Sequence, residues 1–240
     1  MKKNYWYLVI AALVVLAIVI TFVIIRSSQQ PAPGSEIGND QEIIPINGVQ
    51  AQTYLASGTP TLKDDDRIFG SEKAALPIFV YEDYSSPYSA ALADTLDKIQ
   101  AESGNQVAVV VRPYIVSNSV SSLQLAVAVD CAGEQGKWKE MRALLFAQAK
   151  NQQLLADNLP NYVAQLELDD DDFTACLTNP EKSEKIEQSV AEAQGYGVQG
   201  APTLFIGGEM IIGARPYEDF TDSNGDKIVG LKTVVASKIN

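Results

Sequence analysis

The chain has 240 residues, a formal net charge of −12 and a composition that is ordinary for a folded protein. That length holds one domain of usual size together with attachments. The acidity argues against nucleic acid as a partner, because phosphate backbones need clustered Lys and Arg. The sequence contains no histidine, which excludes Ser-His-Asp and Cys-His nucleophile systems and His-ligated zinc. We expect no metal site and no cofactor.

An apolar segment near the N-terminus predicts a membrane span. Leu8 to Ile25 is apolar apart from one threonine, and as a helix it would be about 27 Å long, close to a hydrocarbon core of roughly 30 Å. Two lysines precede the segment and one arginine follows it. The positive-inside rule therefore leaves the N-terminus in the cytoplasm and places the rest on the extracytoplasmic side, periplasmic or extracellular.

A cleaved signal peptide is the alternative for this segment. Its apolar run is longer than the usual run of about 7–15 residues, and no small-x-small cleavage site follows it. Residues 1–26 are therefore predicted to be a cytoplasmic tip and a single-pass signal anchor in the cell membrane.

The next part of the chain predicts a tether and an arm. Ser27 to about Gly38 is rich in Ser, Gln, Pro and Gly, which is typical of a flexible linker. Gln41 to Lys63 has no sustained apolar period, so this arm either packs on the domain or stays loose. Asp64 to Asp66 is compatible with an ion site, but a solvated turn is the simpler interpretation. We assign 27–65 to linker and arm and 66–240 to the folded domain.

The domain begins with a strand, a turn and a helix. Leu76 to Tyr84 predicts a buried strand, which breaks at Ser86-Pro87-Tyr88-Ser89 and opens into a helix that covers Ala90 to Gln100. Backbone N–H groups at a helix N-terminus are unpaired and partly positive, so an anionic nucleophile is stabilised there. Gln106 to Tyr114 is a nearly continuous β-branched run, typical of a strand covered on both faces. Together these segments predict a right-handed parallel βαβ unit.

A helical region follows, and we place it at about residues 116–196. Four segments in it space their apolar residues by three or four positions: Ser121–Val129, Glu134–Ala149, Leu154–Leu166 and Pro180–Gln194. The acidic run Asp169 to Asp172 suggests either a calcium loop or a helix start. Because the ligand spacing of a calcium loop is missing, the helix start is favoured.

The last part of the chain predicts a hairpin and a helix. Val198 to Ile206, the Gly207-Gly208 turn and Met210 to Gly213 have the pattern of a β-hairpin. Asp222 to Asp226 predicts a turn, and a terminal helix is expected from about Lys227 to Lys238.

Four stretches resemble the DsbA-like branch of the thioredoxin fold, over about Leu76 to Asn240. They are Ser86-Pro87-Tyr88-Ser89 in place of the family's Cys-Pro-Tyr-Cys turn, Asp130 to Trp138 like its Cys-Ala-x-x-Gln-Gly-Lys-aromatic helix start, Phe173 to Leu177, and Val198 to Phe205 followed by Gly213-Ala214-Arg215-Pro216. The resemblance implies an α/β, thioredoxin-like fold with a helical insertion, preceded here by one transmembrane helix. It also implies that Pro202 is a cis-proline facing the turn. The cis form is accessible there because an X-Pro peptide bond favours trans by only about 0.5–1 kcal/mol.

The departure from the family lies at its reactive positions. In the family the first cysteine of the turn is the attacking thiolate; here Ser86 holds that position and Ser89 holds the resolving one. A hydroxyl is far less acidic than a thiol, and a helix dipole worth about 0.3–1 kcal/mol cannot ionise it at neutral pH. Because serine also cannot form a disulfide, dithiol exchange at this turn is excluded.

Cys131 and Cys176 are the only cysteines in the chain. An even pair in an exported domain predicts one structural disulfide, closing a loop of about 46 residues. The alternative is a relocated redox pair. It is disfavoured because neither cysteine sits in a Cys-x-x-Cys motif or beside the proline turn, and related exported members carry a comparable second bridge.

The favoured function is that of a tethered, redox-inactive domain that binds an extended polypeptide or an envelope protein client; we do not expect an enzyme. By resemblance, the client pairs with backbone in a groove beside the cis-proline, through Pro87, Tyr88, Ala201, Pro202 and Thr203. Candidates to line the groove are the aromatic residues Tyr81, Tyr84, Tyr88 and Phe205. Two alternatives remain: a DsbA-family thiol-disulfide oxidoreductase in a Cys-to-Ser form, and a structural docking domain of the envelope.

Overall fold

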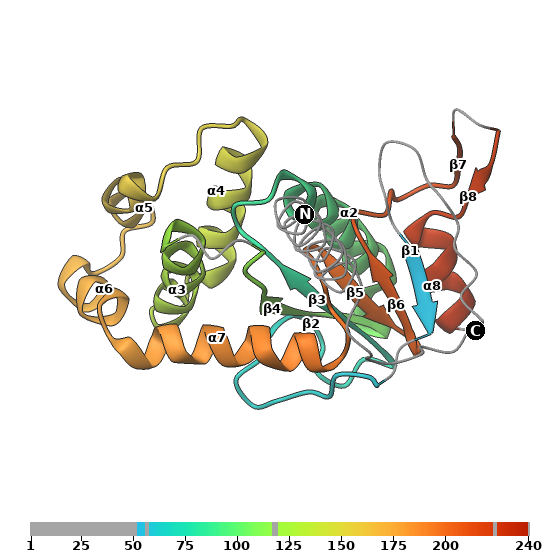
Figure 1. The fold of residues 1–240 in the computed structure, drawn as a ribbon, viewed down its shortest axis with the longest axis horizontal. Coiled ribbons are helices and arrows are strands. Elements are labelled where there is room, and N and C mark those ends of the chain that lie inside the picture. The colour runs from blue at the N-terminus through green and yellow to red at the C-terminus, as the bar shows by residue number, and fades with distance from the viewer. Residues whose placement is uncertain (1–51, 56–57, 117–119, 223–224, 240) are drawn as a thin grey trace, which may run out of the picture. The chain divides into compact units, whose positions relative to one another are not determined.

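The structure, a computed structural model, describes residues 52–55, 58–116, 120–222 and 225–239. In this part of the chain a six-stranded sheet packs against helices, and a block of further helices lies beside it (Figure 1). The predicted membrane span and the flexible linker lie outside the described residues. Among the helices that are described, none has the length and apolar character needed to cross a bilayer.

The sheet has the strand order β1-β6-β5-β3-β4-β2, and only β3 and β4 are parallel neighbours. Its strands are β1 (Gln52–Leu55), β2 (Arg67–Gly70), β3 (Leu76–Glu82), β4 (Val107–Pro113), β5 (Thr203–Ile206) and β6 (Glu209–Ile212). The helix α2 (Pro87–Ser103) connects β3 to β4, with the short η1 (Gly104–Gln106) after it. The predicted βαβ unit is therefore confirmed.

Helices cover both faces of the central strands. On one face, Ile78 and Val80 of β3 pack with α2 and with α8 (Leu231–Ile239). On the other face, Phe79 and Tyr81 pack with Ala193 of α7 (Pro180–Gly195). Because neither face of β3 meets solvent, the strand is apolar at almost every position, as expected for parallel strands in α/β proteins.

The predicted helical region is present as a separate block with its own apolar core, which includes Leu125, Met141, Leu145 and Phe173. Its other elements are α3 (Val120–Glu134), α4 (Trp138–Lys150), η2 (Ala156–Asn158), α5 (Leu159–Gln165) and α6 (Asp170–Leu177). The acidic run is a helix start, as predicted: the Asp169 side chain caps α6 by accepting the Asp172 N–H at 2.9 Å.

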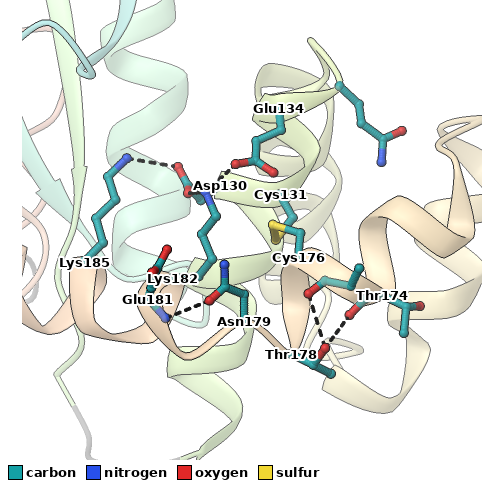
Figure 2. The surroundings of a disulfide bond; sticks show 12 residues. Asp130, Cys131, Glu134, Thr174, Cys176, Thr178, Asn179, Glu181, Lys182 and Lys185 are labelled. Atoms are coloured by element: carbon teal, nitrogen blue, oxygen red, sulfur yellow. Dashed lines mark hydrogen bonds and ion pairs between the residues drawn. A yellow bond between two sulfur atoms is a disulfide. The ribbon is translucent and has the colours of Figure 1, made fainter.

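A disulfide joins Cys131 of α3 to Cys176 of α6 inside this block, with 5.7 Å between the two Cα atoms (Figure 2). Both cysteines are buried. A hollow of about 370 Å³ adjoins them and is also lined by Glu134 and Lys182. The bridge therefore fastens the short α6 to the longer α3, within the helical block and not at the proline turn.

Two parts of the chain differ from the sequence predictions. The arm contributes β1, which pairs with β6 from Gln52↔Ile212 to Leu55↔Glu209; the sheet thus starts upstream of the predicted domain boundary at residue 66. The terminal helix begins at Leu231 and not near 227, because β8 (Lys227–Ile228) pairs with β7 (Phe220–Thr221). Gly230 then fits tightly: a Cβ there would lie 2.3 Å from the carbonyl carbon of Glu218.

The charged segment Lys63–Arg67, which we call the strap, ties the sheet to the helical block. Four of its five charged side chains pair with other elements: Lys63 with Glu192, Asp65 with Lys185, Asp66 with Arg112, and Arg67 with Asp130. The fifth, Asp64, is exposed and has no ion pair among the described residues. The three aspartates are therefore neither an ion site nor a fully solvated turn.

Arg112 of β4 is the centre of these contacts. Its guanidinium donates to both carboxylate oxygens of Asp66, at 2.8 and 2.9 Å, and to the backbone oxygen of Thr61. It also donates to Glu192 of α7 and to the Tyr81 hydroxyl. Every N–H of this buried cation thus has an acceptor, which is the condition under which a buried ion pair is tolerated.

Replacing Asp66 should destabilise the fold, because it leaves the Arg112 guanidinium buried and only partly paired. We expect Asp66→Asn to lower the free energy of unfolding by about 3 kcal/mol. The matched change Asp64→Asn should alter it by less than about 0.5 kcal/mol. Chemical denaturation of the full-length chain in mild detergent measures both, and equal effects of the two changes would contradict this account of the strap.

Removing the disulfide should cost stability without affecting the proline turn. In the chain-entropy picture a loop of this length contributes roughly 4 kcal/mol, less any native strain. We expect the double variant Cys131→Ala/Cys176→Ala to lower the free energy of unfolding by roughly 3–4 kcal/mol relative to the oxidised wild type. The single variant Cys131→Ser should fall within about 1 kcal/mol of the double variant, since either change opens the loop. An unchanged free energy of unfolding in both variants would show that the bridge is dispensable.

Candidate functional site

The proline turn begins where β3 ends, and Ser86 is the N-cap of α2. Its backbone is extended, with φ −88° and ψ 121°, and its Oγ accepts the Ser89 N–H at 3.3 Å. Pro87 follows in the first helical turn, where a missing N–H costs nothing. Ser86 thus satisfies one of the unpaired N–H groups at the helix start, which is a usual role of serine.

Ser89 has a structural partner as well. Its side chain is fully buried, and its Oγ accepts the backbone N–H of Asp83 at 3.2 Å. Among the described residues, no carboxylate or amine accepts a proton from either Ser86 or Ser89. Both hydroxyl oxygens act instead as acceptors of backbone N–H groups within the turn.

Asp83 holds the turn in place. Its Oδ1 accepts the Ser85 N–H at 2.8 Å and the Ser85 hydroxyl at 2.6 Å, and its Oδ2 accepts the Val116 N–H at 3.1 Å. The Ser85 hydroxyl also lies 3.2 Å from that of Ser122 in α3. One buried carboxylate therefore links the turn to the chain leaving β4, and Ser85 links it to the helical block.

The peptide bond between Ala201 and Pro202 is cis, as the resemblance implied. Pro202 is buried, and its carbonyl accepts the Gly213 N–H at 2.7 Å. The pairing of β5 with β3 sets Thr203 opposite Tyr81, so the chain enters β5 at the end of the sheet where β3 leaves for the turn. The cis bond and the turn therefore share one end of the sheet.

The predicted binding residues differ in what they offer. Pro87 and Tyr88 are exposed, with 60% of Tyr88 accessible. Ala201 is half-buried, and no hydrogen bond to its backbone N–H or C=O occurs among the described residues. Thr203 is buried in β5 between two strands, and its hydroxyl donates to the Gly200 carbonyl at 2.7 Å. Its side chain is thus not available to a client.

Three of the four predicted groove aromatics belong to the core. Tyr81, Tyr84 and Phe205 are each at most 4% exposed, so the prediction that they line a groove is wrong; only Tyr88 reaches the surface. The Tyr81 ring meets Phe205 edge-on at 5.9 Å, and burial raises the pKa of Tyr81 to about 12. These rings support the strands beneath the site.

A buried ion pair below the turn was not predicted. The Arg142 guanidinium of α4 donates to both oxygens of Glu82, at 2.5 and 2.9 Å, and both side chains are almost inaccessible. Burial alone would lower the pKa of Arg142, but the Glu82 carboxylate raises it above its ordinary value. The pair joins the last residue of β3 to the helical block. An acidic residue at the end of an apolar strand, such as Glu82, is a sequence signal for a buried ion pair. That signal does not identify Arg142 as the partner.

Comparison with solved structures agrees with the fold. One similar structure is α-DsbA1 of Wolbachia pipientis, at 16% identity and a TM-score of 0.57, which covers 74% of this chain and 92% of that one. Another is α-DsbA2 of the same organism, at 19% identity and a TM-score of 0.56, which covers 63% of this chain and 81% of that one. A thioredoxin-like oxidoreductase from Silicibacter pomeroyi DSS-3 is also similar, at 20% identity and a TM-score of 0.55, over 63% of this chain and 85% of that one. At these identities the likeness concerns the fold alone.

The curated relatives that this chain matches are longer than the chain itself. The chain is 29% identical over 157 residues to the Na⁺/H⁺ antiporter NhaA of Herminiimonas arsenicoxydans, and 29% identical over 159 residues to the Na⁺/H⁺ antiporter NhaA 3 of Salinispora tropica. These matches cover 65% and 66% of this chain and 24% of each relative. The chain thus spans about a quarter of the length of the curated relatives it matches.

A sequence match supplies the family. Residues 62–223 match the family described as thioredoxin, a range that contains the turn, the cis bond, both cysteines and the helical block. The chain belongs to the thioredoxin family, and its structural neighbours are DsbA-like.

Proposed function

We propose that this protein is a membrane-tethered, extracytoplasmic binder of extended polypeptide that performs no dithiol exchange at its turn. One observation carries the proposal: serine occupies both reactive positions, Ser86 and Ser89, while the surrounding frame is in place. A scaffold that holds the helix start and the cis bond but lacks sulfur retains a surface for a chain and loses the means to exchange electrons with it.

The backbone of Ala201 supports the binding part of the proposal. Its N–H and C=O lack partners among the described residues, on a half-buried residue directly before Pro202. An extended peptide can add to such an edge as a short strand, with main-chain hydrogen bonds supplying the affinity. Tyr88 is the exposed aromatic of the neighbouring turn and offers a side-chain contact. None of these contacts needs a thiol.

The disulfide supports the redox part. Both cysteines of the chain are joined in the helical block, and no described cysteine is free. Both also lie toward the C-terminal ends of their helices, α3 and α6, where the dipole disfavours a thiolate. A structural bridge is consistent with these positions, and its presence is consistent with an oxidising compartment.

Two observations support the membrane tether. The apolar run from Leu8 to Ile25 has the length of a bilayer span. The curated relatives are named as antiporters, proteins that exchange ions across a membrane, so sequences like this one occur within membrane proteins.

Capture of an unfolded polypeptide tests the binding surface. The full-length chain, in mild detergent, is titrated against a fluorescently labelled, cysteine-free unfolded polypeptide, and anisotropy reports binding. Pro202→Ala should weaken binding about tenfold. Without the proline the peptide bond after Ala201 favours the trans form, which moves the backbone N–H and C=O of Ala201. The control Pro160→Ala changes an exposed residue of α5 and should bind like wild type. Unchanged binding by Pro202→Ala would favour the docking-domain alternative.

Restoring sulfur tests whether the frame is intact. The double variant Ser86→Cys/Ser89→Cys should reduce and oxidise a test disulfide peptide, and the thiol at position 86 should titrate below about 8.5 because the start of α2 stabilises its anion. The single variant Ser86→Cys is the control, since it has no resolving thiol. A double variant without activity and with an ordinary thiol pKa would show that the site frame has decayed.

A further inference from the structure

A hollow of about 320 Å³ lies beside the turn, and neither Ala201 nor Pro202 lines it. Ser85 of the turn and Ser122 of α3 form one wall. Leu154, Leu155 and Asp157, from the connection between α4 and α5, form another. The hollow therefore lies between the turn and the helical block, and all of these residues belong to the described part of the chain.

The lining of the hollow combines leucine side chains with serine hydroxyls and carries one charge. Leu125 and Leu154 supply apolar surface, and Asp157 is the only charged residue that lines it. A second carboxylate, Asp83, lies behind the wall and is bonded to Ser85. The start of α3 contributes about half a positive charge, which two carboxylates outweigh. The hollow thus disfavours an acidic side chain and suits an apolar stem with a cationic head.

Exposed apolar side chains gather around this hollow. Five large apolar side chains are exposed in the described part of the chain. Leu155 lines the hollow, Tyr88 belongs to the adjoining turn, and Val116 is bonded to Asp83 through its backbone. Three of the five exposed apolar residues therefore lie at this end of the sheet, and so does the backbone of Ala201.

The position of the hollow relative to Ala201 determines how many peptide residues separate the residue that pairs with Ala201 from the residue that enters the hollow. Ala201 leads into β5, on one side of β3, whereas α3 follows β4, on the other side. Ser85, which lines the hollow, follows β3, and β3 is the direct neighbour of β5. Neighbouring strands lie about 4.8 Å apart and an extended peptide rises about 3.3 Å per residue, so the hollow is reached from Ala201 by a side chain about two or more residues along the peptide.

We propose that the hollow accepts a lysine or arginine side chain of the polypeptide that pairs with Ala201, about two or more residues from the pairing position. The stem of the side chain packs on the leucines, and the head faces Asp157. This inference rests on the proposed function, since it names the kind of polypeptide that the same site selects. It predicts a preference for basic clients by a protein that is itself strongly acidic.

The test uses three labelled peptides that share one extended sequence and differ at a single position, which carries lysine, norleucine or glutamate. Each is titrated against the full-length chain in mild detergent at low salt. We expect the lysine peptide to bind about threefold more tightly than the norleucine peptide, the size of an exposed ion pair. The glutamate peptide should bind most weakly.

Variants assign the preference to the hollow. Asp157→Asn should remove the advantage of lysine over norleucine and leave norleucine binding unchanged, and Leu155→Ala should weaken both peptides. The control Asp64→Asn removes another exposed carboxylate, from the strap, and should leave the preference intact.

The outcomes separate this inference from the function on which it rests. Peptides that bind wild type without a lysine preference, or with a preference that survives Asp157→Asn, overturn the inference and leave polypeptide binding standing. Failure of all three peptides to bind overturns the proposed function itself.

Discussion

The burial of β3 between β4 and β5 is the constraint on which the site depends. Its parallel pairing with β4 and its antiparallel pairing with β5 fix its register on both sides. A shift of one residue would turn its apolar side chains to the wrong face, and both faces are packed. Because the register is fixed, the turn after Glu82 and the cis bond before Thr203 must meet at one end of the sheet.

Charged contacts then hold this end against the helical block. The Glu82–Arg142 pair joins β3 to α4, and the strap joins the segment before β2 to α3 and α7. Asp83 fixes the backbone of the turn itself. These contacts are made by carboxylates, guanidinium and ammonium groups, the Ser85 hydroxyl and backbone, so the frame does not depend on a thiol at position 86 or 89. Serine at both positions is therefore compatible with the geometry of the turn.

The central elements were predictable because local sequence determines them. The β-branched runs of β3 and β4 and the Gly207-Gly208 turn, with φ of 55° and 86°, leave few alternatives. The four-residue strand β1 was not predicted, because it is held by pairing with β6 far along the chain. The partners of the strap are also distant in sequence: Lys63 and Glu192 are 129 positions apart.

Side-chain exposure was harder to predict than the elements themselves. Alternation along a strand tells the two faces apart, but here both are covered, so Tyr81 and Phe205 are core residues whichever way they point. The turn lies between β3 and α2, where the Pro-Tyr pattern placed it, and Tyr88 is the one exposed residue among the four predicted groove aromatics.

Amide hydrogen exchange at Ala201 tests the central claim most directly. In the unliganded full-length chain this amide has no hydrogen-bond acceptor among the described residues, so its exchange should be fast. Addition of a bound, cysteine-free extended peptide should slow it, because the peptide supplies the acceptor. Peptide binding that protects other amides and leaves Ala201 unchanged would contradict the account.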